Sequence, residues 1–130
     1  MHLEPTFHMT PSYCAIASMG SGPAAPSVGW VTMCYWPGDE CLAFLDSYGV
    51  LPDFRGAGHS LKLLEHAAKA ACSHGIKCIV TYTAGWNVAS NNALISAGYK
   101  TFTPAHFLGY PGGLGEGWIH WFKRLNPSAN

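Results

Sequence analysis

The first half of the chain has the residue pattern of β-strands. Residues 28–36, VGWVTMCYW, are rich in β-branched and aromatic side chains, and the turn PGDE at 37–40 separates them from a similar run at 41–51. A shorter run of this kind lies at 12–18, whereas residues 1–11 indicate no more than an extended backbone. The pattern predicts three strands, the last two of which form a hairpin.

The second half changes to helical spacing. Leu61, Leu64 and Ala68 recur at intervals of three and four residues, and Gly75 ends the pattern. The elements expected after it are a strand at 77–83, a short helix at 90–97, and strands at 100–103 and 118–123. No repeat or linker interrupts this order, so we expect one domain over residues 1–130 with the element order β-β-β-α-β-α-β-β.

Charge and composition indicate which kinds of partner the protein could bind: nucleic acid, a membrane or another protein. Seven Lys and Arg balance seven Asp and Glu, so no bulk positive field favours nucleic acid or a membrane surface. The apolar runs are far shorter than the roughly 18 residues that a membrane span needs, and we expect no secretion signal. Only 11% of residues are charged and 48% are hydrophobic, so we expect a partner to cover part of the apolar surface.

Cysteine and histidine spacing bears on redox state and metal binding. The five cysteines include no CxxC pair, and the seven histidines form no HExxH motif or short cluster. We therefore expect no disulfide framework and no metal site. Reduced thiols in turn favour a cytoplasmic protein.

Residues 50–64, VLPDFRGAGHSLKLL, hold the most informative pattern of the chain. A strand ends, a proline follows, and a glycine-rich turn leads directly into the helix. The unpaired N–H groups and the dipole of a helix N-terminus attract anions, and Gly56 and Gly58 let a phosphate approach the backbone. Arg55 adds a cation beside the turn. The nucleotide-binding patterns GxxxxGK and GxGxxG are absent, and a glycine-rich turn without a ligand is the alternative.

Two segments resemble elements of the GNAT superfamily of N-acetyltransferases. Residues 55–60, RGAGHS, resemble its acyl-CoA pyrophosphate loop, in which Gln or Arg is followed by Gly at the fourth place and Gly or Ala at the sixth; Ser60 departs from this last place. Residues 87–99 resemble its element NxxSxxxLxxxG, which ends in an aromatic residue. The resemblance covers about residues 28–125 and implies an α/β (α+β) fold with a mixed, mainly antiparallel sheet flanked by helices.

The resemblance also implies a reaction and a set of ligand contacts. Acetyl-CoA would be the donor, and an amine would attack its thioester directly. Backbone groups at the end of the strand before the loop would bind pantetheine and polarise the thioester carbonyl. The implied cofactor-binding residues are Tyr48, Gly49, Val50, Arg55, Gly56, Ala57, Gly58, His59, Ser60, Leu61, Lys62, Asn87 and Ser90.

Asp46 is the first candidate for the base that deprotonates the amine. Strand alternation predicts that it lies on the same face as Tyr48 and Val50, where some family members carry a base. Its alternative role is a strand-end carboxylate that is hydrogen-bonded to backbone or water. Tyr82 is a second candidate, as a proton relay, unless it is simply a packed strand aromatic. The general-acid tyrosine of many family members would fall at Leu94 and is absent here.

The chain departs from the family at its front end. The family usually places a strand and one or two helices before the first hairpin, whereas about a dozen residues precede the first clear strand here. A catalytically silent GNAT-fold binding or structural subunit is therefore the alternative to an acetyltransferase. The low charge and the aromatic strand 118–123 predict a homodimer joined at that strand, with one subunit covering the acceptor groove of the other.

Overall fold

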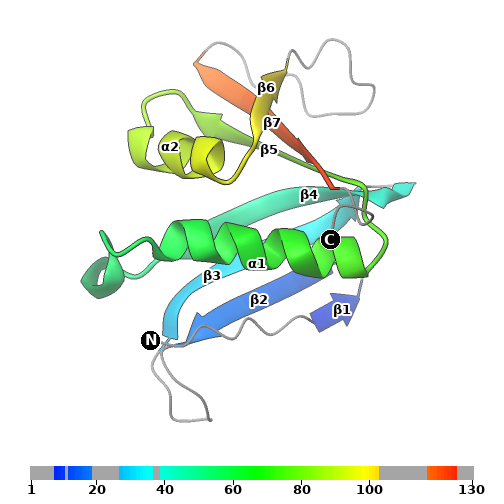
Figure 1. Cartoon of the computed structure of the whole chain (residues 1–130), viewed down its shortest axis with the longest axis horizontal. Helices are drawn as coiled ribbons and strands as arrows, with labels where there is room; N and C mark the ends of the chain where they lie inside the picture. The colour runs from blue at the N-terminus through cyan, green and yellow to red at the C-terminus, as the bar shows by residue number, and fades with distance from the viewer. Residues whose placement is uncertain (1–7, 11, 19–26, 37–38, 103–116, 126–130) are drawn as a thin grey trace.

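A seven-stranded sheet organises the computed structural model, which describes residues 8–10, 12–18, 27–36, 39–102 and 117–125. The strand order is β1-β2-β3-β4-β5-β7-β6, and every neighbouring pair is antiparallel except β4 with β5. Helices α1 and α2 cover the same face of the sheet (Figure 1). The elements are β1 (His8–Thr10), β2 (Ser12–Ser18), β3 (Ser27–Trp36), β4 (Asp39–Val50), the 3-10 helix η1 (Pro52–Phe54), α1 (His59–Ser73), β5 (Cys78–Ala84), α2 (Val88–Ser96), β6 (Lys100–Phe102) and β7 (Trp118–Arg124).

The predicted fold class is confirmed, because the sheet is mixed, mainly antiparallel and flanked by helices. The element order is also confirmed, with one short strand, β1, added at its start. Helix α2 begins at Val88, two residues earlier than predicted, because Asn87 caps it. Of the turn predicted at 37–40, residues 37–38 lie outside the described residues, and β4 already begins at Asp39.

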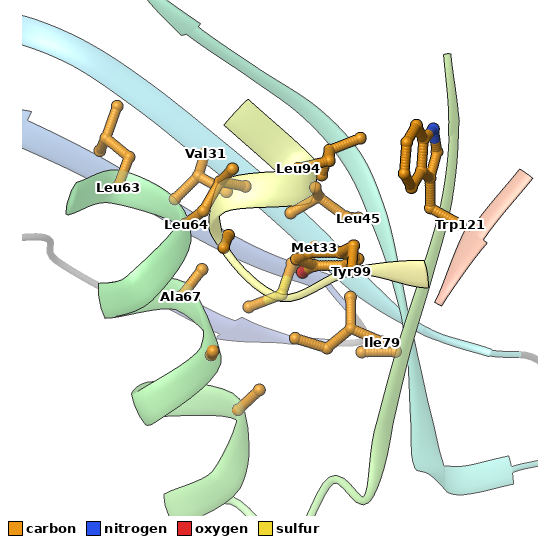
Figure 2. Packing of buried hydrophobic residues seen from close by; sticks show 14 of the residues in the cluster. Val31, Met33, Leu45, Leu63, Leu64, Ala67, Ile79, Leu94, Tyr99 and Trp121 are labelled. Atoms are coloured by element: carbon orange, nitrogen blue, oxygen red, sulfur yellow. The ribbon is translucent and has the colours of Figure 1, made fainter. Parts of the chain in front are cut away.

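The main core lies between the helices and the sheet. Leu63, Leu64, Ala67 and Ala71 form the fully buried stripe of α1, so the predicted helical spacing is confirmed. Alanine side chains in this stripe let the helix axis lie close to the strands. The stripe faces a buried cluster that includes Val31 and Met33 of β3, Leu45 of β4, Ile79 of β5, Leu94 of α2, Tyr99 and Trp121 (Figure 2).

A β-bulge in β4 changes which side chains share a face. Met33 pairs with Leu45 and Thr32 with Ser47, so β4 has one residue more than β3 at this point. Leu45 before the bulge and Tyr48 after it both pack on the helix side. The two residues between them, Asp46 and Ser47, are exposed on the opposite face. The prediction that Asp46 shares a face with Tyr48 is therefore wrong, because strict alternation does not continue through a bulge.

The C-terminal strand β7 lies inside the sheet. It pairs with β5 over Trp118–Arg124 on one side and with the short strand β6 over His120–Phe122 on the other. Trp121 is only 3% exposed and packs in the core, whereas Trp118 is 42% exposed. The homodimer joined at this strand stays a prediction, with Trp118 as its exposed aromatic side chain.

The length and the apolar character of a helix decide whether it could cross a membrane. Neither α1 nor α2, the α-helices of the described residues, combines the length and apolar character that crossing a membrane requires.

Candidate functional site

Strands β4 and β5 pair over only part of their length, and a fork opens between them. Their parallel pairing ends where Phe44 meets Val80. The Thr81 hydroxyl still donates to the Leu45 carbonyl over 2.8 Å. From there β4 continues to Val50 with no β5 partner among the described residues (Figure 1). The fork therefore leaves main-chain groups of β4 available that a continuous sheet would pair.

A pocket of about 650 Å³ lies on the helix-covered side of this fork. Small-molecule sites have volumes of about 300–1,000 Å³. Three parts of the chain line the pocket: the end of β4, the turn that leads into α1, and the first turns of α2. The lining residues are Tyr48, Gly49, Val50, Phe54, Arg55, Gly56, Gly58, His59, Ser60, Leu61, Asn87, Ala89, Ser90, Asn92, Ala93 and Ser96.

The turn between β4 and α1 presents its backbone to the pocket. The Arg55 Nε donates to the Val50 carbonyl over 3.0 Å, which holds the guanidinium beside the end of β4. Gly56 and Gly58 have φ angles of +84° and +78°, and a Cβ at either position would meet no atom within 4 Å. The space beside these glycines lets an anion approach main-chain N–H groups closely.

The first turn of α1 offers hydrogen-bond donors that the helix itself cannot use. Gly58 is the N-cap and supplies no side-chain acceptor. The N–H of Lys62 is the first to reach back, to the Gly58 carbonyl at 3.3 Å, so the N–H groups between them have no acceptor within the helix. His59 is 4% exposed, and its Nδ1 has no hydrogen-bond partner among the described residues. Free N–H groups, the helix dipole and a buried ring nitrogen suit this end of the pocket to a phosphate.

The N-terminus of α2 also borders the pocket, but the side chain of its N-cap residue, Asn87, already accepts a hydrogen bond from the helix. Asn87 Oδ1 accepts from the Ser90 N–H over 3.2 Å. From β4, the Tyr48 hydroxyl donates to the Ser90 carbonyl over 3.2 Å and also hydrogen-bonds the Ser90 Oγ. Burial raises the pKa of the Tyr48 phenol, and the hydrogen bond with Ser90 offsets this only in part. A protonated phenol therefore bridges β4 and α2 at the wall of the pocket.

A polar network holds α2 against the sheet, and the sequence did not indicate it. Trp121 Nε1 donates to Thr83 Oγ1 over 2.9 Å, and the Thr83 hydroxyl donates to Asn91 Oδ1 over 2.5 Å. Asn91 Nδ2 then donates to the carbonyls of Ala84 and Gly85 at 3.4 and 3.3 Å. The network stabilises the position of α2 because its buried polar groups are paired. Its members lie on three separate elements, so no local sequence pattern marks them.

The pocket brings together most of the residues that the sequence predicts for cofactor binding. All of them line it except Ala57 and Lys62, which are exposed. The prediction missed one aromatic residue of η1 and four small or polar residues of α2. These are Phe54, Ala89, Asn92, Ala93 and Ser96.

The two predicted catalytic residues are not among the residues that line the pocket. Asp46 is exposed at the bulge, where burial and, to a smaller extent, this nearby carboxylate raise the pKa of the Cys34 thiol. Tyr82 packs on the same side of the sheet, with its ring centroid 5.7 Å from that of Phe44 and 5.4 Å from that of Trp118. The helix-free side of the fork thus carries both Asp46 and Tyr82. We call it the aromatic face, after the rings of Phe44, Tyr82, Phe102, Trp118, His120 and Phe122.

The polar groups that line the pocket are of the kind that binds an organic ligand rather than a metal ion. These groups are main-chain N–H groups, hydroxyls, amides, one imidazole and one guanidinium. In the described part of the chain, no three His, Cys, Asp or Glu side chains gather closely enough to hold a metal ion. The chemistry of these polar groups suits an organic ligand that carries phosphate at one end.

Comparison with known proteins gives a consistent result. A profile of the Acetyltransferase (GNAT) family matches residues 11–99. A search of curated protein sequences finds no match. Among solved structures, a nourseothricin acetyltransferase superposes with a TM-score of 0.65 and 18% identity over 89% of this chain and 66% of its own.

Two further structures have similar scores. A Bacillus subtilis acetyltransferase in complex with CoA superposes with a TM-score of 0.69 and 14% identity over 89% of this chain and 78% of its own. An IAA acetyltransferase from Bacillus cereus gives a TM-score of 0.69 and 17% identity over 88% of this chain and 79% of its own. The chain thus spans less than two thirds of the nourseothricin enzyme and a larger share of the other two. At these identities the likeness establishes the fold.

Proposed function

The chain belongs to the GNAT acetyltransferase family, and from this premise we propose that it transfers an acetyl group from acetyl-CoA to an amine by direct attack on the thioester. The observation that carries the proposal is the pocket at the β4–β5 fork. One of its walls is the glycine turn and uncapped start of α1, and another is the end of β4, which pairs with β3 but has no β5 partner among the described residues.

The pyrophosphate of CoA is proposed to bind at residues 55–62. Arg55 supplies a fixed positive charge, and Gly56 and Gly58 leave room beside the backbone. The N–H groups at the start of α1 supply donors, and the unpartnered Nδ1 of His59 gains a ligand. The proposal includes Ala57 through its main chain and Lys62 through its charge, although neither lines the pocket.

The pantetheine arm and the thioester are proposed to lie along Tyr48, Gly49 and Val50. These residues follow the last β4–β5 pair, so main-chain groups on the β5 side are free to bind an extended ligand. An N–H group there would polarise the thioester carbonyl and stabilise the oxyanion of the tetrahedral intermediate. Asn87 and Ser90 border the pocket on its α2 side and would contact the same arm.

The acceptor amine is proposed to approach from the aromatic face. The fork opens the sheet between its two sides, so an amine on this face can reach a thioester held from the helix side. Asp46 would take the ammonium proton, directly or through water, and the free amine would attack the carbonyl carbon. Tyr82 is proposed as a relay in the same proton path.

An amine screen tests the function directly. Acetyl-CoA is incubated with primary amines of small molecules, peptides and nucleosides, and the CoA thiol released is measured with a thiol-reactive dye. Cys41 is an exposed free thiol, so each assay needs a baseline without amine. Thiol release that depends on the amine supports the proposal. CoA binding with no turnover for any amine supports instead a catalytically silent subunit.

We propose further that the protein is a cytoplasmic homodimer. Cys34, Cys41, Cys72 and Cys78 are free thiols, as a reducing compartment would keep them. The exposed apolar side chains nearest to one another in sequence are Trp86, Val88 and Ile95, around α2, at 82%, 63% and 60% exposure. They offer a surface for self-association that does not require the edge of a strand. A monomer mass by light scattering at micromolar concentration would contradict the dimer.

A further inference from the structure

Tyr48 carries a side chain that the function proposed above does not use. Three of the pocket-lining residues have titratable side chains: Tyr48, Arg55 and His59. Arg55 and His59 belong to the turn and the first turn of α1, where phosphate is expected. Tyr48 instead lies at the fork and reaches Ser90 at the start of α2.

Helix α2 itself supplies no proton donor with a tunable pKa. Its sequence, VASNNALIS, contains only aliphatic, hydroxyl and amide side chains. Leu94, in the second half of the helix, is fully buried in the core. Of the groups that line the described pocket, the Tyr48 hydroxyl is therefore the titratable donor beside the expected thioester.

Such a donor can assist one step of thioester cleavage. When the tetrahedral intermediate collapses, the electron pair of the C–S bond moves to sulfur. A thiol has a pKa of about 8.5, so its thiolate leaves without a strong acid, but a nearby donor stabilises the charge as it develops. The effect is larger in a pocket that is partly shielded from water, because the local dielectric is low.

We propose that the Tyr48 phenol is the general acid that protonates the CoA sulfur, an inference that rests on the proposed acetyltransferase function. As the C–S bond breaks, the phenolic O–H proton moves to sulfur and CoA leaves as the thiol. The nitrogen, which bears the new N–C bond, loses its extra proton to Asp46 or to solvent. The Tyr48 phenolate regains a proton from solvent through the Ser90 hydroxyl, so the protein returns to its starting state.

The surroundings of Tyr48 keep the phenol in the form that can donate. Burial raises its pKa above its ordinary value of 10.0, so the hydroxyl stays protonated at and well above neutral pH. Tyr99, which follows α2, is a second phenol that interacts with Tyr48; its pKa is also raised, first by burial and then by Tyr48. Arg55 and His59 are the other titratable groups that line the pocket, at its phosphate end. Loss of the phenolic proton at high pH should therefore remove the donor.

A matched pair of variants tests this role. Tyr48→Phe keeps the ring and removes the hydroxyl, while Tyr99→Phe removes a neighbouring phenol whose buried hydroxyl has no partner among the described residues. Thiol release from acetyl-CoA is measured with hydroxylamine, a small nucleophile that needs no dedicated acceptor site. We expect Tyr48→Phe to lower kcat about 10- to 100-fold, at the low end of general-acid effects because thiolate is a good leaving group. CoA affinity should change less than about twofold, and Tyr99→Phe should match the wild type.

The pH profile separates acid catalysis from packing. A fluorinated tyrosine at position 48 has a more acidic phenol, so the falling limb of kcat against pH should move to lower pH. An unchanged limb, or Tyr48→Phe with wild-type kcat, would overturn the role of Tyr48 while leaving the acetyltransferase proposal intact. A wild type that binds acetyl-CoA but releases no thiol with hydroxylamine or any amine would overturn both.

Discussion

The two sides of the sheet at the β4–β5 fork are built from different chemistry. The helix side presents main-chain N–H groups, two glycines with positive φ, and the starts of α1 and α2. The aromatic face presents side chains: a series of rings in contact, the exposed carboxylate of Asp46 and the Cys34 thiol. The same two strands, β4 and β5, contribute side chains to both sides, because successive residues of a strand point to opposite faces of the sheet except at the bulge.

Under the proposed function, this difference gives the two sides separate tasks. Backbone groups and helix ends can bind a phosphate whatever side chains surround them, so they suit a cofactor that many relatives share. Rings and a single carboxylate discriminate between acceptors, because shape and charge at those positions depend on each side chain. Changes in the glycine turn of the helix side should therefore alter cofactor affinity, and changes on the aromatic face should alter turnover.

The largest effect is expected from Gly58→Val. A branched side chain would fill the empty space beside the turn and block the approach of the pyrophosphate, so CoA affinity should fall more than about 100-fold. Calorimetry with CoA measures the change. Gly75→Val is the matched control, because Gly75 follows α1 with a φ of +81°, and a Cβ there would also meet no atom within 4 Å.

Both glycine variants carry the same kind of backbone strain, at least about 1–2 kcal/mol for a side chain in the left-handed region. Their melting temperatures should therefore fall together, while only Gly58→Val should lose CoA. Unchanged CoA affinity in Gly58→Val would remove the assignment of the phosphate to this turn.

The next largest effect is expected from Asp46→Asn on the aromatic face. Loss of the base should lower kcat about 100-fold with an amine that supports thiol release, because an amide does not accept the ammonium proton. CoA affinity should stay the same, since Asp46 does not line the pocket. Asp39→Asn is the control, because Asp39 lies at the start of the same strand. Its Oδ1 accepts a hydrogen bond from the Cys41 N–H over 2.9 Å, and the amide oxygen of asparagine can accept the same bond. Full activity in Asp46→Asn would transfer the proposed role to Tyr82 or to solvent.

The smallest effect concerns the Cys34 thiol. Burial and the Asp46 carboxylate both disfavour its thiolate and raise its pKa. Removing the negative charge in Asp46→Asn should lower the pKa of Cys34, so its alkylation at a fixed alkaline pH should become faster. Mass spectrometry of the Cys34 peptide separates this site from the exposed Cys41. An unchanged alkylation rate would contradict the placement of Asp46 beside Cys34.

The sequence by itself determined the features that depend on neighbouring residues. Strand and helix positions followed from residue periodicity, because each element must place its apolar side chains on one side. The turn at Gly56 and Gly58 followed from the freedom of glycine to adopt positive φ. The existence of α2 followed from its local pattern, although the cap at Asn87 starts it two residues earlier than the sequence predicted. Most of the pocket could be predicted because its lining comes from these local features.

Only the tertiary structure decided the features that depend on distant partners. The bulge opposite Thr32 placed Asp46 on the aromatic face, because strand register is set by pairing with β3 and not by β4 alone. The tertiary structure also placed β7 between β5 and β6, so the last strand in sequence is not the last strand of the sheet. The contact of Tyr48 with Ser90 joins residues 42 positions apart. Such contacts form when packing brings whole elements together, and local residue preferences carry no information about which distant side chains will then meet.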